Sequence, residues 1–118
     1  MLPPIYTILS SNTAVAAIAA DRIYPHGEAP QNVERPYVTW FLVSGLPENE
    51  LDGLPDVDRC AVQIDCWADD GTGAVQLASA VRDAIEPHAH VTNIALNGKE
   101  PETGLYRFAI QTDYWLSR

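Results

Sequence analysis

The sequence predicts an α+β fold in which a mainly antiparallel four-stranded sheet packs with two or three helices, in the order α-(α)-β-β-α-β-β. Two stretches, residues 59–67 and 105–116, alternate apolar and polar side chains strictly, which is the pattern of strands with one buried face. Between them, residues 72–86 carry apolar side chains at helical spacing. At 118 residues, the chain is expected to form a single domain, 1–118.

The N-terminal part predicts two short helices. The prolines at residues 3–4 suit the first turn of a helix, and the apolar residues within 5–9 share one face. Asn12 or Thr13 can cap a second helix over residues 14–20. An extended segment and a loop rich in turn-forming residues then lead to the sheet.

The rest of the chain alternates strands with loops and one helix. Residues 36–45 are dense in β-branched and aromatic side chains and form the first long strand. Residues 46–58 form a loop with five carboxylates and no basic residue. After the helix at residues 72–86, which Pro87 ends, a weak strand is expected within residues 90–96. The alternating stretch at residues 105–116 closes the sheet.

The two alternating strands nearly repeat each other. AVQIDCW at residues 61–67 returns as AIQTDYW at residues 109–115, but the flanking segments do not recur, so a solenoid or propeller is not indicated. We instead expect two strands of one sheet that share an apolar face and a polar face edged with tryptophan. Large aromatic and arginine side chains among polar groups are typical of protein–protein interfaces, so this face is a candidate subunit interface. The alternative is that a helix covers it and the tryptophans belong to the core. Its expected members are Trp40, Arg59, Gln63, Asp65, Trp67, Arg107, Gln111, Asp113 and Trp115.

Charge and cysteine content narrow the class of protein. The formal net charge is −9, from 16 acidic and 7 basic residues, so the protein as a whole should repel nucleic acid and anionic membranes. No apolar run is long enough to cross a bilayer and no signal peptide is recognisable, so we expect a soluble intracellular protein with no membrane partner. Cys60 and Cys66 fall on one strand face, too far apart for a disulfide, and are expected to be buried thiols.

The candidates for chemistry are weak. His26, His88 and His90 could be metal ligands, but no cysteine or nearby carboxylate completes the set. Asp65 and Asp113 suggest paired carboxylates of a hydrolase, although antiparallel copies of one motif need not bring them together. We therefore expect no catalytic residue, no metal site and no cofactor.

Five segments, taken in order, resemble the tail-completion or tail-terminator family of long-tailed bacteriophages. No single segment is specific, and the resemblance rests on their order, their spacing and the total length. The segments are AVAAIAADRIYP (14–25), RPYVTW (35–40), DRCAVQIDCWAD (58–69), VRDAI (81–85) and LYRFAIQTDYWL (105–116).

The resemblance implies a structural protein of the virion neck, made in the host cytoplasm during assembly. Family members form a homo-oligomeric ring, usually of six copies, that caps the head-proximal end of the tail tube. Their implied partners are the tail tube protein and the head-completion or stopper protein, while DNA passes through the lumen without specific binding. The family has no catalytic residues. Alternatives are another neck component, such as a head-side stopper or adaptor, or a small metal-dependent hydrolase.

The acidic loop suggests a role within such a ring. Carboxylates on a lumen wall would repel the phosphates of passing DNA, since charges act over ~8 Å at physiological salt. An equally simple interpretation is that the loop keeps the protein soluble. The candidate lumen or partner-facing residues are Glu48, Glu50, Asp52, Asp56 and Asp58.

Overall fold

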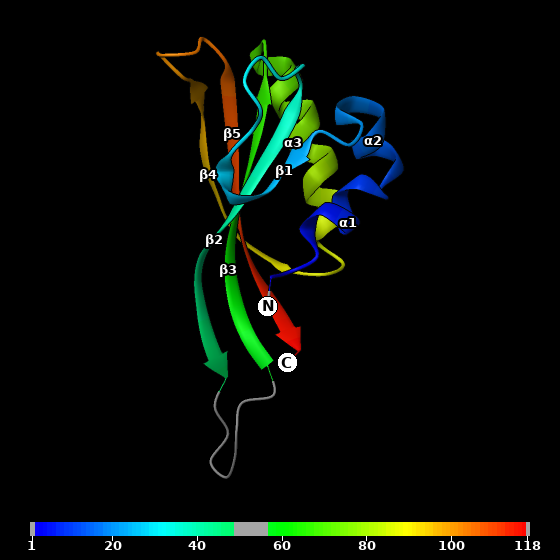
Figure 1. The fold of residues 1–118 in the computed structure, drawn as a ribbon, viewed down its shortest axis with the longest axis vertical. Helices are drawn as coiled ribbons and strands as arrows, with labels where there is room; N and C mark the ends of the chain where they lie inside the picture. Colours follow the sequence, from blue (N-terminus) through cyan, green and yellow to red (C-terminus); the bar gives the residue numbers. More distant parts are fainter. Residues whose placement is uncertain (1, 49–56, 118) are drawn as a thin grey trace.

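Three α-helices lie on one face of a twisted β-sheet in the computed structural model, which describes residues 2–48 and 57–117 (Figure 1). The helices are α1 (Ile5–Ser10), α2 (Thr13–Ala19) and α3 (Gly71–Ile85), with a short 3-10 helix, η1 (Pro25–Gly27). The strands are β1 (Ile23–Tyr24), β2 (Tyr37–Glu48), β3 (Val57–Ala68), β4 (His90–Lys99) and β5 (Tyr106–Ser117). The predicted α+β class and the order of the main elements are confirmed.

The described residues form a sheet of five strands, in the order β1-β2-β3-β5-β4, where four were predicted. The additional strand, β1, pairs in parallel with β2 and makes the sheet mixed, whereas the other three pairings are antiparallel. The sequence indicated only an extended segment there. Tertiary packing adds the strand because Ile23 is buried beside Val38, its partner in the register.

Side-chain caps begin two of the helices. Asn12, one of the two predicted caps, accepts a hydrogen bond from the Val15 backbone nitrogen at 3.1 Å and starts α2. In the same way, the Asp70 carboxylate accepts from the Gly73 nitrogen at 2.6 Å and starts α3. Gly71 and Gly73 therefore belong to a helix entry, and α3 ends just before Pro87, as expected.

The core lies between the helices and one face of the sheet. The central strands β3 and β5 contribute Val62, Ile64 and Ile110, each at most 1% exposed, and α3 packs against both strands. Cys60 and Cys66 are buried free thiols on this face, as predicted. Burial raises the pKa of both thiols above the ordinary value, so neither is poised to react as a thiolate.

One end of the sheet projects beyond the helices (Figure 1). β1 pairs with β2 only at Val38 and Thr39, and β4 pairs with β5 only as far as Asp113. Beyond those positions the described sheet consists of β2, β3 and β5 alone, and we call this part the three-stranded end: residues 45–48, 57–60 and 114–117. Among the described residues, no helix is both long and apolar enough to span a membrane.

Candidate functional site

The sheet face opposite the helices, here called the open face, carries eight of the nine residues predicted to share a polar face. The register explains how the repeat is used: the two copies run antiparallel, with Gln63 directly opposite Gln111. This pairing relates the copies by an approximate two-fold axis through the glutamines. Each tryptophan therefore lies opposite the arginine of the other repeat, and each aspartate lies opposite the alanine of the other repeat. The pairs are Trp67 with Arg107, Trp115 with Arg59, Asp65 with Ala109, and Asp113 with Ala61.

The same register keeps the two aspartates apart. Along the strands Asp65 and Asp113 lie four positions from each other, which corresponds to about 13 Å. The hypothesis of paired carboxylates is therefore wrong. His90 lies opposite Asp113, and His26 lies in η1. Within residues 2–48 and 57–117, no three histidine, cysteine or acidic side chains are grouped so that they could hold a metal ion.

A chain of side-chain hydrogen bonds crosses the centre of the open face. Gln111 Nε2 donates to Gln63 Oε1 at 3.2 Å, and Gln63 Nε2 donates to the Asp65 Oδ1 atom at 3.0 Å. Asp65 is only 4% exposed, although it carries a carboxylate. Burial raises the pKa of Asp65, while the Gln63 hydrogen bond and the charge of Arg107 oppose that rise. The central part of the face is thus a satisfied polar layer.

The half of the open face around Trp67 is covered from within the chain. Tyr37 stacks on the Trp67 ring at 6.0 Å between ring centroids, with 13° between the ring planes. On the other side, the Arg107 guanidinium lies 5.5 Å from the Trp67 ring centroid, close enough for a cation–π contact. The Trp67 indole Nε1 donates to the Thr39 hydroxyl at 3.0 Å.

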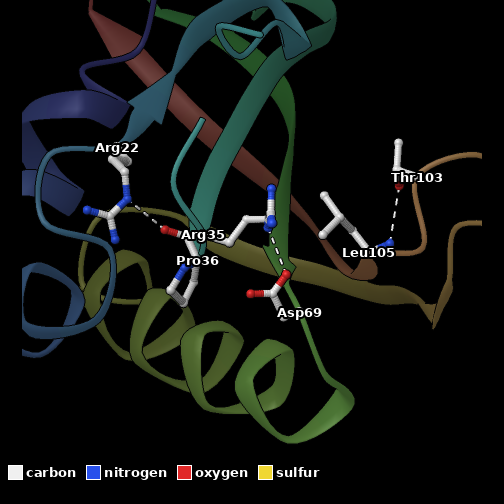
Figure 2. A network of polar contacts seen from close by, with 6 residues as sticks. All are labelled: Arg22, Arg35, Pro36, Asp69, Thr103 and Leu105. Carbon is white, nitrogen blue, oxygen red and sulfur yellow. Dashed lines mark hydrogen bonds and ion pairs between the residues drawn. The ribbon is translucent and has the colours of Figure 1, made fainter. Parts of the chain in front are cut away.

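The loop that follows η1 lies beside this half of the face. Arg22 Nε donates to the Pro36 carbonyl at 3.0 Å, and Arg35 Nε donates to the Asp69 carboxylate at 2.7 Å, so both arginines anchor the loop (Figure 2). A pocket of about 410 Å³ lies between the loop and the β4–β5 turn at residues 103–105, with Trp67 in its lining. The sequence does not predict these loop contacts, because an arginine bond to a carbonyl 14 residues away leaves no local pattern.

The other half of the face, around Trp115, has no such cover from the described residues. Trp115 is 47% exposed, and Leu46, in the same cross-strand row beyond Arg59, is 50% exposed. β4 ends two positions earlier along β5, at the pairing of His90 with Asp113. Two halves with the same residue pattern are therefore in different environments, one packed internally and one accessible.

Trp40 is a correction to the predicted face. It pairs with Ile64 in the register, lies on the helix-covered side and is 5% exposed. The reason is the alternation within β2: Tyr37 lies opposite Trp67 on the open face, so Trp40, three positions later, points into the core. The aromatic side chain that β2 contributes beside Trp67 on the open face is Tyr37.

The predicted acidic loop is only partly within the described residues. Asp58 is half-buried in β3, opposite Pro47 on one side and Leu116 on the other. Glu48 ends β2, but its side chain, together with Glu50, Asp52 and Asp56, lies outside the described part of the chain. The lumen role of these carboxylates stays a prediction.

Comparisons with known proteins bear on the whole chain. The model of the family described as "Tail completion protein gp17" matches residues 3–117. Among solved structures, a chain of the virion of a native gene transfer agent particle has a similar fold, with a TM-score of 0.67 at 14% sequence identity. That match covers 97% of this chain and 92% of the other. No curated protein sequence matches significantly.

Proposed function

Because this chain belongs to the tail completion protein gp17 family and is a virion-associated tail protein, we propose that it forms a ring at the neck of a phage-like particle. In this proposal the ring, of six copies, caps the head-proximal end of the tail tube. It contacts the tail tube protein on one side and a head-completion or stopper protein on the other, and DNA passes through its lumen.

The observation that carries the proposal is the accessible half of the open face. A monomeric protein gains stability by burying tryptophan, yet Trp115 is 47% exposed in a row with the exposed Leu46. A ring needs two different patches on each copy, because its contacts are heterologous. We propose that the face formed by Arg59, Gln63, Asp65, Trp67, Arg107, Gln111, Asp113 and Trp115 contributes to one of them, with Trp115 as the most accessible contact.

The charge of the protein supports the DNA-conducting part of the proposal. A net charge of −9 disfavours adhesion of DNA to the ring, so DNA would pass without being held. We propose that the carboxylates of Glu48, Glu50, Asp52, Asp56 and Asp58 line the lumen or face a neighbouring protein.

The test is the mass of the purified protein by light scattering over a range of concentrations, with electron microscopy of the same sample. The expected result is a closed ring whose hole admits duplex DNA. A monomer at every concentration requires the same measurement with tail tubes added, because the tube end can serve as the template. A protein that remains monomeric and does not bind the tubes would contradict the proposal.

The alternative is that the protein occupies a different position in the neck, and the tail-tube experiment also distinguishes this alternative from the proposal. A head-side stopper or adaptor would bind head-completion proteins and leave bare tube ends unoccupied. A terminator is expected to bind those ends and to stop further tube growth, which electron microscopy measures as a fixed tube length.

A further inference from the structure

The three-stranded end leaves two strand edges without a partner in the described chain. On one side, β2 pairs with β1 only at Val38 and Thr39, so the outer edge of residues 40–48 has no neighbouring strand. On the other side, β4 stops beside Asp113, so the outer edge of residues 114–117 has none. Free edges expose backbone donors and acceptors that readily pair with another strand.

The two edges differ from most of the surface in charge and polarity. Residues 42–46 and 114–117 contain no charged side chain, in a protein of net charge −9. Four of the large apolar side chains that are exposed in the described residues lie on these edges; they are Leu42, Val43, Leu46 and Trp115, 36–56% exposed. Copies of an acidic protein repel each other over most of their surfaces, so two uncharged edges are where they can approach.

The approximate two-fold symmetry of the open face indicates what Trp115 lacks. In the covered half, β2 runs beside β3 and places Tyr37 against the Trp67 ring. The symmetry-related position for Trp115 would be a strand beside β5 at the same row, and β4 ends before reaching it. A strand added along residues 114–117, in either direction, would therefore cover Trp115 from the side where β4 is missing.

We propose that this strand is the β2 edge of a second copy, so that the sheet continues from β5 of one subunit into β2 of the next. This inference rests on the proposed ring. Strands β2 and β5 lie on opposite sides of β3 and run in the same direction, so the contact is parallel and joins unlike edges. If the cross-strand rows of one subunit align with those of its neighbour, Leu46 of one subunit packs against Trp115 of the other.

Two other pairings fit the structure less well. Two β5 edges together would form an isologous contact, which closes at a dimer and leaves both β2 edges free. The β4 edge has two register shifts, after Val91 and after Ile94, and such irregularities hinder strand addition. By contrast, β5 keeps an unbroken register with β3 over residues 106–117, and β2 does so from Ser44 onward.

Thiol cross-linking of the full-length protein tests the unlike pairing. Ser44 and Ser117 are exposed, one on each edge, and Ser44→Cys and Ser117→Cys add one reactive thiol each. With level rows, Ser44 of one copy and Ser117 of the next are four rows apart, so a cross-linker of about 13 Å is suitable. The native Cys60 and Cys66 are buried and provide the unreactive background.

The expected result is specific to unlike edges. Each single variant alone gives no cross-linked dimer, an equal mixture of the two gives dimers and nothing larger, and the double variant gives a ladder up to the full ring. Dimers from one single variant alone would overturn the proposal, because like edges would then meet. Rings in light scattering without cross-links would overturn the strand pairing but leave the proposed ring intact. Monomers that neither cross-link nor bind tail tubes would contradict both.

A charge placed on the β2 edge provides a second measurement. Val43→Lys should raise the concentration needed for assembly by about tenfold or more, because the strand contact would have to desolvate an ammonium group. The matched control is Val75→Lys on α3, where the same residue type is 43% exposed and lies on neither strand edge. Equal assembly by the two variants would overturn the proposal, and circular dichroism verifies that both are folded.

Discussion

At the scale of single residues, Trp40 and Trp115 have different surroundings. Substituting Trp40 should affect the stability of the fold, whereas substituting Trp115 should affect assembly. Trp40 is 5% exposed within the core, so Trp40→Ala should lower the free energy of unfolding by about 3–5 kcal/mol. Trp115→Ala should change it by less than about 1 kcal/mol and instead weaken ring formation. Urea unfolding and light scattering of both variants measure the two effects.

The control for this pair is Trp40→Phe. It keeps an aromatic ring and removes no hydrogen bond, because the Trp40 indole Nε1 has no partner within the described residues. Its loss of stability should therefore be clearly smaller than that of Trp40→Ala. If Trp115→Ala unfolded the protein as readily as Trp40→Ala, Trp115 would be a core residue and the interface role would be lost.

Asp65 should give the stability a distinctive pH dependence. Because burial raises its pKa above the ordinary 3.8, the folded protein holds this proton more tightly than the unfolded chain does. This contribution to the free energy of unfolding is therefore most favourable at acidic pH and declines as the pH rises through the raised pKa. In Asp65→Asn the contribution is absent, so the stability of the variant relative to the native protein should increase from about pH 4 to pH 7.

Urea unfolding of both proteins at several pH values measures that difference. Asp113→Asn is the matched control, since Asp113 occupies the symmetry-related position but is only partly buried. Its change in stability is subtracted from that of Asp65→Asn, so that the difference isolates the effect of burying the carboxyl at position 65. A relative stability of Asp65→Asn that stays constant or falls with pH would show that the Gln63 and Arg107 interactions outweigh the burial of the carboxyl.

At the scale of elements, the cap of α3 is a local determinant of stability. The Asp70 carboxylate satisfies the Gly73 nitrogen, which has no helical partner of its own. Asp70→Ala should cost about 1 kcal/mol and lower the Tm by about 4 °C, and Asp70→Ser should restore most of the loss. Thermal unfolding followed by circular dichroism checks both. Asp69→Ala, which removes only an exposed ion pair with Arg35, should cost less; an equal cost would count against the cap.

The elements whose signal is local could be predicted from the sequence. Alternation identified β3 and β5, helical spacing and Pro87 identified α3, and the cap residue placed the start of α2. The other features depend on contacts that no local pattern records. The two-residue strand β1 exists because β2 lies beside it, and the bulges in β2 and β4 shift which side chains share a face.

The residues of the open face could be predicted wherever apolar and polar side chains alternate. The prediction is wrong where this alternation is missing. Gln63 and Gln111 alternate in step with their neighbours, so period two placed them correctly on one side. In β2 the dense apolar run around Trp40 has no polar alternation to fix its orientation, so the prediction for Trp40 is wrong. The difference between the two halves of the face follows from where β4 ends and could not be predicted from the repeat.

At the scale of the whole molecule, the concentrated negative charge and the proposed subunit contacts belong to different segments of the chain. Residues 42–46 and 114–117 of the strand edges proposed to join copies are uncharged, whereas carboxylates concentrate in the sequence between β2 and β3. Changing Glu48, Glu50 and Asp52 to lysine moves the formal net charge from −9 to −3, since each change adds two units. The fold and the assembly of the ring should persist, because all three residues lie outside the uncharged segments 42–46 and 114–117 of the two edges.

If those carboxylates line a channel for DNA, the lysine variant should hold DNA by contacts with its phosphates and slow its passage. Particles carrying the variant should then eject DNA more slowly than native particles, and the difference should shrink as salt is raised, because ions screen such contacts. Substitution of the same residues by glutamine removes the charge without reversing it and should give an intermediate rate. Assembly and ejection at the native rate in both variants would leave the segment with no role in DNA passage and favour the simpler function of maintaining solubility.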